Sequence, residues 1–312
     1  MIKKKFKKVL VVLGGISGER AVSLESGRAC IKALKKKRYK VSSFDPKFKN
    51  LNLINKKNVD VIFNALHGKG GEDGIAQTYF EYLKIPYTHS GVISSHNSMN
   101  KIISKEIFIK KKITTPKFFV LNKKKFNDQK LKKNIIKKKI IFPIVVKPVD
   151  EGSSLGVVMC KDNNELLKET KKLLKKYNQL IFEEYVGGQE IQVAVINGKP
   201  LGAIELVPKR LFYDYKAKYT KSAKTKHIMP ARLNKTSYNE VLKIAKKAHQ
   251  VLGCKGITRS DFKYYKNKFN LLEINTQPGM TNLSLVPEIA SFKGLSFENL
   301  VEKILLDASI NR

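Results

Sequence analysis

The sequence predicts a mixed α/β protein that begins with a parallel α/β unit and continues into two further β-rich regions. Apolar strand-like segments alternate with amphipathic helical patterns over residues 1 to about 95. Alternating segments joined by short turns follow, which is typical of antiparallel hairpins. With 312 residues and 42% hydrophobic content, the chain is long enough for two or three domains and a sizeable core.

The first 97 residues are predicted to form a parallel α/β domain. Residues 8–13 and 59–66 are apolar enough for buried strands, and a glycine-rich turn follows each. An amphipathic helix should come after the first turn, because apolar residues recur there at helical spacing. Its stripe is Ser26, Ala29, Cys30, Ala33 and Leu34, and a second helix is expected through Ile75, Tyr79, Tyr82 and Leu83.

A second domain is predicted over residues 98–186. It should open with a helix over 98–111, which Thr114-Thr115-Pro116 ends. The lysine-rich stretch 123–139 is interpreted as exposed helix and loop. Asp162 and Glu165 have the pattern of a capping box for a helix to about residue 176. Strands are predicted at 144–148, 157–160 and 180–186.

Residues 187–312 are predicted to form a third domain, which begins with a Gly187-Gly188 hinge. Asn197-Gly198 is the strongest short signal for a hairpin in this chain. Residues 208–230 are polar and aromatic without periodicity, so we expect a long functional loop there. Strands are expected at 190–196 and 201–207, and helices at 237–252 and from about 296.

The segment over residues 259–280 carries the clearest chemical pattern. Asp261 follows a β-capable stretch, and residues 271–275 alternate like a strand, which puts Glu273 and Asn275 on one face. If the two segments pair as a hairpin, Asp261 projects beside them. Two carboxylates and an amide oxygen suit Mg²⁺, which completes its octahedron with phosphate oxygens. The alternative is a solvated hairpin face without a metal.

Three further segments are candidates for holding a nucleotide. The loop over 151–156 has the composition of a phosphate cover, because glycines let backbone N–H groups approach phosphate oxygens. An ordinary Gly-Ser hairpin has the same composition. Lys147 lies at the end of an apolar strand, and Lys101 lies early in a helix. The strand over 180–186 could present its backbone and a carboxylate to an adenine, or be an ordinary strand with exposed glutamates.

The formal net charge of +36 raises the alternative of a nucleic-acid-binding protein without catalysis. Only seven of the 62 basic residues are Arg, which is the usual bidentate reader of bases and phosphates. The lysines are spread along the chain, so we interpret them as a biased, solvated surface and expect no specific nucleic-acid partner. A nucleic-acid role would also leave Glu19, Asp261 and Glu273 unexplained.

Cysteine usage and hydropathy indicate a cytoplasmic protein. Cys30, Cys160 and Cys254 form no ligand-spaced pair, so we expect them to be buried and reduced. The apolar run after the N-terminal lysines spans only five residues and leads into Gly14-Gly15, which favours a first strand over a signal peptide. No run of about 18 apolar residues occurs, so no membrane span is expected.

Three long motifs stand in order along the chain. The first covers residues 14–27 and begins Gly-Gly-Ile-Ser-Gly-Glu, and the second covers 66–74 and reads Leu-His-Gly-Lys-Gly-Gly-Glu-Asp-Gly. The third extends from Gly256 to Pro287 and includes Arg-Ser-Asp-Phe and Leu-Glu-Ile-Asn-Thr-Gln-Pro-Gly. Together they resemble the signatures of the D-alanine–D-alanine ligase family. The resemblance implies an ATP-grasp fold, in which a Rossmann-like N-terminal domain and two further subdomains enclose the ATP site.

The resemblance implies ATP and two Mg²⁺ ions per site as cofactors, with Mn²⁺ as a possible replacement. The residues implied to hold the metals are Asp261, Glu273 and Asn275. Those implied to contact the ATP phosphates are Lys101, Lys147 and Lys218, under a loop that contains Ser153 and Ser154. Those implied to hold the nucleoside are Glu183 and the Tyr185 and Val186 backbone for adenine, and Glu190 for the ribose.

The resemblance also implies the reaction, in which ATP drives the joining of two D-alanines through a D-alanyl phosphate for peptidoglycan precursors. Glu19 would bind the ammonium of the first D-alanine, and Ser153 and Tyr219 would link to it and close the loop. Arg259 and the Gly279 N–H would stabilise the oxyanion. Further substrate contacts are implied for His67, and for Ser284 and the Leu285 N–H at the carboxylate of the second D-alanine. A homodimer is also implied, without a membrane partner.

Two positions depart from the usual residues of this family. Asn100 stands where Asp is common, and Lys216 stands where an acidic residue is frequent. Tyr219 favours an amine acceptor, since relatives that make D-alanyl-D-lactate tend to carry Phe there. A ligase with another acceptor, such as D-lactate or D-serine, is the alternative within the family.

Overall fold

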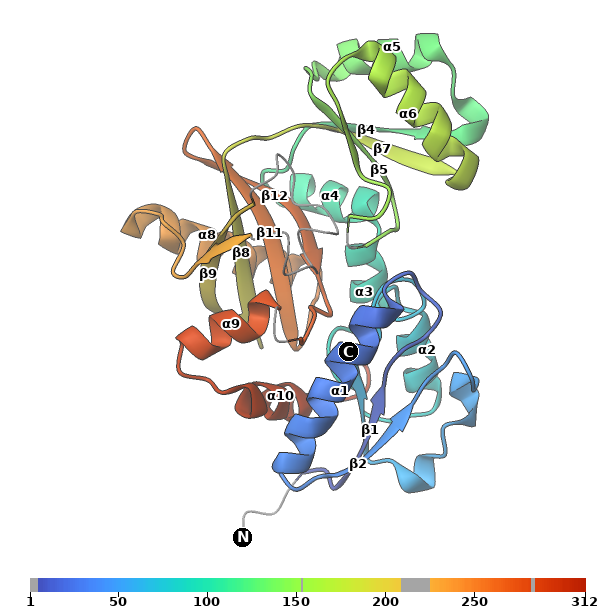
Figure 1. The fold of residues 1–312 in the computed structure, drawn as a ribbon, viewed down its shortest axis with the longest axis vertical. Coiled ribbons are helices and arrows are strands. Elements are labelled where there is room, and N and C mark those ends of the chain that lie inside the picture. Colours follow the sequence, from blue (N-terminus) through green and yellow to red (C-terminus); the bar gives the residue numbers. More distant parts are fainter. Residues whose placement is uncertain (1–4, 153, 209–224, 282–283) are drawn as a thin grey trace.

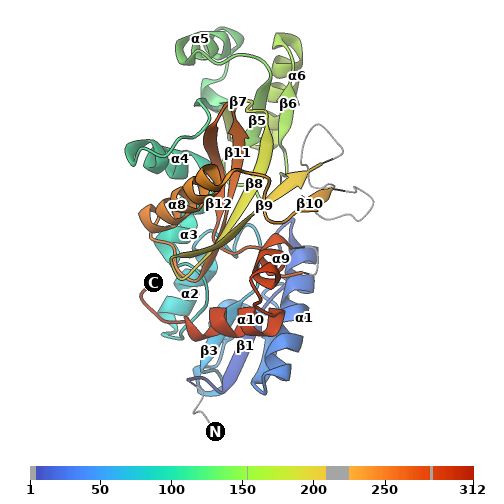
Figure 2. The ribbon, with the colours of Figure 1, turned by 90° about the vertical axis from the view of Figure 1, so that its left-hand side faces the viewer.

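The computed structural model describes residues 5–152, 154–208, 225–281 and 284–312. Three sheets follow one another along the long axis of this described part, with helices packed around them (Figure 1). A three-stranded parallel sheet lies at the bottom of the view, a five-stranded antiparallel sheet in the middle and a four-stranded antiparallel sheet at the top (Figures 1 and 2). The predicted mixed α/β class is confirmed.

The N-terminal unit is a parallel sheet with a helix on each face. Its elements are β1 (Lys8–Val12), α1 (Arg20–Lys36), β2 (Lys40–Phe44), the 3₁₀ helices η1 (Leu51–Leu53) and η2 (Lys56–Asn58), β3 (Val61–Asn64) and α2 (Ile75–Tyr82). The strand order is β2–β1–β3. β1 buries Val9 and Val11 in the core that α1 covers, and Leu10 and Val12 in the core that α2 covers. β2 was not predicted, because most of its residues are polar and partly exposed.

The four-stranded sheet and its helices enclose a core of their own. Its elements are β4 (Phe118–Asn122), η3 (Lys123–Lys125), α5 (Asp128–Lys138), β5 (Ile144–Pro148), β6 (Val158–Cys160), α6 (Asn163–Lys176) and β7 (Gln179–Glu184). The strand order is β4–β7–β5–β6. Phe119 and Phe182 stack in its core with ring centroids 4.8 Å apart. The predicted cap of α6 is confirmed, because Asp162 accepts a hydrogen bond of 2.9 Å from the Glu165 N–H.

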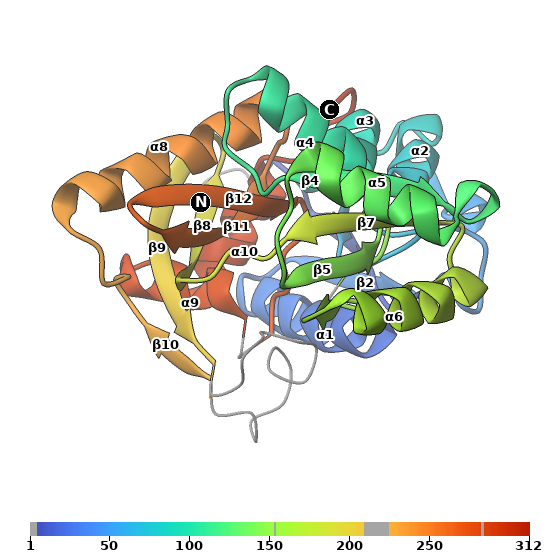
Figure 3. The same ribbon diagram turned by 90° about the horizontal axis from the view of Figure 1, so that it is seen from above.

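The five-stranded sheet lies between helices of the C-terminal half. Its elements are β8 (Gln189–Ile196), β9 (Lys199–Val207), β10 (Lys226–Ile228), α8 (Lys235–Val251), β11 (Ile257–Tyr265), β12 (Lys268–Asn275) and α9 (Leu285–Phe292). The strand order is β10–β9–β8–β11–β12, and α8 lies across one face of the sheet (Figure 3). β8 buries Val193 and Val195 on the α8 side, and Ala194 and Ile196 on the α9 side. Both predicted hairpins, β8–β9 and β11–β12, are confirmed.

Two predicted features of the chain are wrong. Two helices, α3 (Val92–Met99) and α4 (Lys101–Lys110), replace the single helix expected over 98–111. Asn100 between them is extended, and its side chain accepts hydrogen bonds of 3.0 and 3.2 Å from two N–H groups in the first turn of α4. This cap starts a new helix. β10 lies within the predicted 208–230 loop, of which residues 209–224 are outside the described part.

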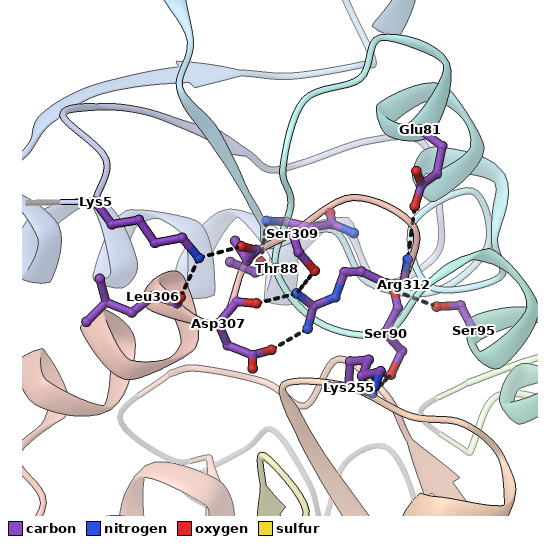
Figure 4. Close-up of polar contacts among 12 residues, drawn as sticks. Lys5, Glu81, Thr88, Ser90, Ser95, Lys255, Leu306, Asp307, Ser309 and Arg312 are labelled. Atoms are coloured by element: carbon purple, nitrogen blue, oxygen red, sulfur yellow. Dashed lines mark hydrogen bonds and ion pairs between the residues drawn. The ribbon is translucent and has the colours of Figure 1, made fainter.

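The last residues of the chain return to the N-terminal unit. α10 (Phe297–Leu306) packs against α1 in a shared core. The Tyr87 N–H donates to the Ser309 carbonyl at 3.1 Å, which adds both residues to the edge of the parallel sheet next to β3. Figure 4 shows this segment, in which the Lys5 ammonium donates to two carbonyls at the end of α10, each at 3.0 Å. Arg312, whose side chain is buried, pairs with Asp307.

The cysteines are buried, free thiols, as predicted. Burial raises the pKa of Cys254 to about 11, so this thiol stays protonated and unreactive at neutral pH. Within the described ranges, no helix is both long enough and apolar enough to cross a membrane.

Candidate active site

Two adjoining cavities lie between the three sheets. The upper cavity is bounded by β5, β7, β8, β11 and β12, and the lower cavity by the starts of α1 and α4 and the segment after β12. Lys101, Glu151 and Glu273 line both cavities, so the two spaces meet at these side chains. A reaction between a group held in one cavity and a group held in the other would take place at this junction.

The upper cavity gathers most of the predicted nucleotide contacts. Lys101 is buried at the start of α4 and donates a hydrogen bond of 2.5 Å to the Glu151 carbonyl in the loop after β5. Lys147 enters from β5, where it is the partner of Ile181 in β7. The predicted residues that line this cavity are Lys101, Lys147, Ser154, Glu183, Tyr185, Val186, Glu190, Asp261 and Glu273. Lys218 lies outside the described residues.

The β11–β12 hairpin brings the predicted metal ligands together. Asp261 and Glu273 are direct partners across the hairpin, and Arg259 is the partner of Asn275. The Arg259 guanidinium donates two hydrogen bonds to the Asp261 carboxylate, at 2.7 and 2.9 Å. The amide nitrogen of Asn275 donates to the same carboxylate, at 3.5 Å from Asp261 Oδ2. Lys101 approaches Glu273 at 3.7 Å. Asp261 lines the upper cavity, Asn275 lines the lower cavity and Glu273 lines both, so the three side chains lie around the cavity junction.

The lower cavity is built around a buried carboxylate, that of Glu19, which is only 5% exposed. β1 and the Gly14-Gly15 turn deliver Glu19 to the N-terminal end of α1. A Cβ on Gly68 or on Gly152 would lie 2.6 Å from Glu19 Oε2, so both loops approach this carboxylate closely. Only glycine permits this approach without displacing the carboxylate. Residues from the N-terminal unit and from the loop after β5 therefore share one small pocket.

His67 and Glu72 complete the wall of the lower cavity. Burial lowers the pKa of His67 to about 4, so the ring is neutral at neutral pH and lies 3.3 Å from Ser26 Oγ. Burial and the nearby Glu19 raise the pKa of Glu72 to about 8. Glu72 accepts a hydrogen bond of 2.6 Å from the Gly68 N–H and so fixes the loop. Glu72 lies within the second motif of the sequence, but no role was predicted for it.

The turn after β12 closes the lower cavity. Gly279 lines the cavity, and a Cβ on it would lie 2.9 Å from Ser284 Oγ. Ser284 Oγ accepts a hydrogen bond of 2.9 Å from the Thr281 N–H, which holds the turn. Leu285 begins α9, where the first N–H groups of a helix lack intrahelical partners. The predicted Ser153 and Tyr219 lie outside the described residues.

Comparison with known proteins decides the family. Residues 107–306 match the family model described as D-ala D-ala ligase C-terminus, and residues 43–90 match the model described as D-ala D-ala ligase N-terminus. A D-alanine–D-alanine ligase from Pelagibacter ubique (strain HTCC1062) is 57% identical over 310 residues, which are 98% of this chain and 99% of that protein. The chain belongs to the D-alanine–D-alanine ligase family.

Solved structures of this family have the same fold. A D-alanine–D-alanine ligase from Bacillus anthracis complexed with ATP aligns with a TM-score of 0.84 and 32% identity over 97% of both chains. VanG D-Ala:D-Ser ligase from Enterococcus faecalis aligns with a TM-score of 0.82 and 27% identity, over 96% of this chain and 98% of that one. The predicted D-alanine–D-alanine ligase family and its ATP-grasp fold are confirmed.

One buried residue of this family member escaped sequence reasoning. Lys105 is 0% exposed in α4, and its ammonium lies 3.0 Å from Glu183 Oε1. Lys147 approaches the other oxygen of Glu183 at 2.7 Å. Burial alone would raise the pKa of Glu183, but the two ammonium groups hold it below its ordinary value. Burial lowers the pKa of Lys105 to about 8. In so lysine-rich a chain, no local pattern distinguishes Lys105.

Proposed function

We propose that this chain uses ATP to join two D-alanines into D-alanyl-D-alanine, through a D-alanyl phosphate. Membership of the D-alanine–D-alanine ligase family supports this type of reaction. The location of the reaction is supported by one observation, which is that the upper and lower cavities meet at Lys101, Glu151 and Glu273. A phosphate donor above and a carboxylate below would be brought into contact there.

ATP would occupy the upper cavity. The base would lie against the backbone of Tyr185 and Val186, next to the Glu183 carboxylate, at the edge where the chain passes from β7 to β8. The ammonium groups of Lys101 and Lys147 would face the phosphates, since both line the cavity on rigid elements. The remaining proposed contacts are Glu190 to the ribose, Ser154 in the loop over the phosphates, and Lys218 and Ser153, which lie outside the described residues.

Asp261, Glu273 and Asn275 would hold two Mg²⁺ ions, with Mn²⁺ able to replace them. The donor set fits, because two carboxylates and an amide come from one hairpin. Asp261 and Glu273 are partners that line the upper cavity proposed for the phosphates, and Asn275 lines the adjoining lower cavity. No group of three or more His, Cys, Asp and Glu side chains suited to a metal occurs among the described residues, so phosphate oxygens would have to complete the coordination. The ions would neutralise charge on the transferred phosphoryl group.

Glu19 would hold the first D-alanine through its ammonium group. Its buried carboxylate is the anion that such a cation requires, and neutral His67 beside it adds no competing positive charge. The first D-alanine's own carboxylate would then face the junction and attack the γ-phosphate. Ser153, in the 151–156 loop, and Tyr219, in the 208–230 loop, would form a hydrogen-bonded link with Glu19, which would exclude the water that hydrolyses an acyl phosphate.

The second D-alanine would attack the acyl phosphate from the Gly279 side of the lower cavity. Ser284 and the N–H groups at the start of α9, including that of Leu285, would hold its carboxylate. Arg259 and the Gly279 N–H would donate to the oxygen that becomes negative as the new bond forms. Donors directed at such an oxyanion each contribute about 2.7–4 kcal/mol to catalysis.

We further propose that the protein works as a cytoplasmic homodimer in the synthesis of peptidoglycan precursors. Free, buried cysteines agree with a reducing compartment. Ile75, Tyr79 and Tyr82 form an exposed apolar face of α2, at 50%, 36% and 79% exposure, which is a surface that a second copy could cover. A mass measured by light scattering that equals one chain would contradict the dimer.

The reaction is tested by release of phosphate from ATP in the presence of D-alanine or L-alanine. We expect release with D-alanine and Mg²⁺, and only background release with L-alanine or after chelation. Folded protein that releases no phosphate with D-alanine would exclude the proposed function.

The choice of the second substrate needs its own experiment, because a relative with the same fold is a D-Ala:D-Ser ligase. Product analysis with equal D-alanine, D-serine and D-lactate should give D-alanyl-D-alanine as the main product. A main product that contains D-serine or D-lactate would leave the family and the first half-reaction intact and change the acceptor.

A further inference from the structure

α4 carries a second buried lysine one helical turn after Lys101. Lys105 and Lys101 share a face of the helix, because residues four apart lie above one another. Of these two lysines, only Lys101 is among the described residues that line the upper and lower cavities. The Lys105 ammonium is fixed by a hydrogen bond of 2.6 Å to Thr115 Oγ1 and by the Phe118 ring, 5.7 Å away. A fully buried ammonium is costly and calls for a partner of opposite charge.

That partner is Glu183, which Lys105 shares with Lys147. Glu183 is 3% exposed, and its two oxygens lie 3.0 Å from Lys105 and 2.7 Å from Lys147. One carboxylate therefore has two ammonium partners, and the cluster has a net charge of +1. The two lysines differ in position, because Lys147 and Glu183 line the upper cavity and Lys105 does not. The Lys147 ammonium can therefore turn toward a ligand in the upper cavity, whereas the Lys105 ammonium stays with Glu183.

A nucleotide in the upper cavity would change the pairing of Glu183 with its two lysines. The inference rests on the proposed function, in which Lys147 is drawn to the phosphates of ATP. Glu183 would then lose its nearer partner while still buried, and an unpaired buried carboxylate takes up a proton. Lys105 prevents this, because its ammonium cannot reach the phosphates and remains paired with Glu183.

We propose that Lys105 is a positioning residue that keeps Glu183 ionised, and so selective for adenine, while Lys147 holds the phosphates. An ionised carboxylate only accepts hydrogen bonds, and it can therefore bind the amino group of adenine and repel the keto oxygen of guanine. A protonated carboxyl group could donate to that keto oxygen. Lys105 thus acts on the base through Glu183 and touches no part of the nucleotide itself.

The resting protein should tolerate the loss of Lys105. Lys105→Met keeps an unbranched side chain, one atom shorter and without the charge, and leaves Lys147 and Glu183 as a neutral pair. The loss of Lys105 should weaken ATP binding without lowering the stability of the free protein. This separates the proposed role from a structural one, because a structural lysine would lower the melting temperature of the free protein and affect every nucleotide equally.

The experiment measures binding of ATP and of GTP to the full chain without D-alanine, together with the melting temperature. For Lys105→Met we expect about tenfold weaker ATP binding, a preference for ATP over GTP reduced by about tenfold, and a melting temperature within a few degrees of the parent. Lys110→Met, an exposed lysine of the same helix, should match the parent in all three measurements. In a Glu183→Gln background, Lys105→Met should weaken ATP binding by no more than about twofold.

Each outcome decides a different question. The inference is overturned if Lys105→Met binds ATP as the parent does and keeps its preference for ATP over GTP. It is also overturned if Lys105→Met weakens the binding of ATP and GTP equally. A third contrary result is that Lys105→Met weakens ATP binding as much in the Glu183→Gln background as in the parent. If Lys105→Met does not fold, Lys105 is structural at the least, and Thr115→Val becomes the deciding variant. It loosens the ammonium without removing it, and it should weaken ATP binding about threefold and leave GTP binding unchanged. A parent protein that binds no ATP would instead refute the proposed function.

Discussion

Among single residues, Glu273 has the most central position. It lines both cavities, opposes Asp261 across the hairpin and lies 3.7 Å from the Lys101 ammonium. Its side chain is 25% exposed, so it faces a space that a ligand can fill and does not support the core. The proposed metal site and the proposed phosphate site therefore share this carboxylate.

Replacing Glu273 should stop the reaction without unfolding the protein. Glu273→Gln keeps the shape and removes the charge, so we expect kcat to fall by about 10²–10³ or more. The melting temperature should change little. Phosphate release with D-alanine measures the activity, and Glu106→Gln, an exposed glutamate on α4, is the matched control. Full activity in Glu273→Gln would refute the assignment of the metal and phosphate site.

Site residues could be predicted from the sequence where the pattern that marks them lies within one short segment. Asp261, Glu273 and Asn275 could be found because alternation along two short strands places them on one face. Lys105 could not, because its role depends on β5 and β7, which come from distant segments, and on burial that the surrounding lysines disguise. Glu72 likewise gains its raised pKa from burial and from Glu19, which is far away in the sequence.

Among the elements, the loop after β5 connects the two halves of the proposed site. It places the Glu151 carbonyl on Lys101 and Gly152 against Glu19, so it contacts the proposed phosphate site and the proposed D-alanine site together. Movement of this loop would affect both substrates.

A methyl group on this loop should disturb the binding of D-alanine. A Cβ at position 152 would lie 2.6 Å from Glu19 Oε2 and displace that carboxylate. We expect Gly152→Ala to raise the KM for D-alanine about tenfold or more, with ATP binding less affected. Steady-state kinetics with each substrate varied in turn measure the difference. Gly187→Ala meets no atom within 4 Å and is the control. Equal kinetics for the two variants would contradict the close approach to Glu19.

Element boundaries were predictable where turn or cap chemistry is strong. Asn197-Gly198 and Lys266-Asn267 adopt the positive φ that tight hairpin turns need, and both hairpins were expected. The break between α3 and α4 was missed, since Asn100 is compatible with a helix interior and becomes a cap only when the chain turns there. β2 was missed because its position in the sheet, rather than its own composition, makes it a strand.

For the whole molecule, the return of the C-terminal segment to the N-terminal unit is the main feature that sequence reasoning did not find. α10 and α1 share a core, and single bridges join β3 to Tyr87 and Tyr87 to Ser309. Pairing between the two ends of a chain leaves no periodic signal in the sequence. It links the first and last described parts of the fold.

Buried histidines should make the stability of the whole fold dependent on pH. Burial lowers the pKa of His67 and His249 to about 4 and that of His89 to about 3. The unfolded chain takes up these protons near pH 6.5 and the folded chain does not. The free energy of unfolding should therefore fall as pH drops from about 6.5 to 4, by about 1.4 kcal/mol per pH unit for each histidine.

A variant isolates one histidine from the opposing contribution of Glu72. The raised pKa of Glu72 means that the folded chain binds a proton below about pH 8, which stabilises the fold as pH drops. His249→Gln should reduce the pH slope of the unfolding free energy by about 1.4 kcal/mol per pH unit between pH 6 and 4.5. Urea denaturation across this range measures the slope. His96→Gln, on an exposed position, should leave it unchanged, and an unchanged slope in His249→Gln would contradict the buried neutral ring.

The central claim is that a D-alanine carboxylate in the lower cavity attacks a phosphate in the upper one. The most direct test supplies D-alanine labelled with ¹⁸O in its carboxylate and analyses the released phosphate by mass spectrometry. Attack by the carboxylate forms a D-alanyl phosphate, and its later aminolysis leaves one labelled oxygen on the phosphate. The proposed mechanism predicts phosphate that carries one ¹⁸O atom for each dipeptide formed. Dipeptide formed with unlabelled phosphate would contradict it.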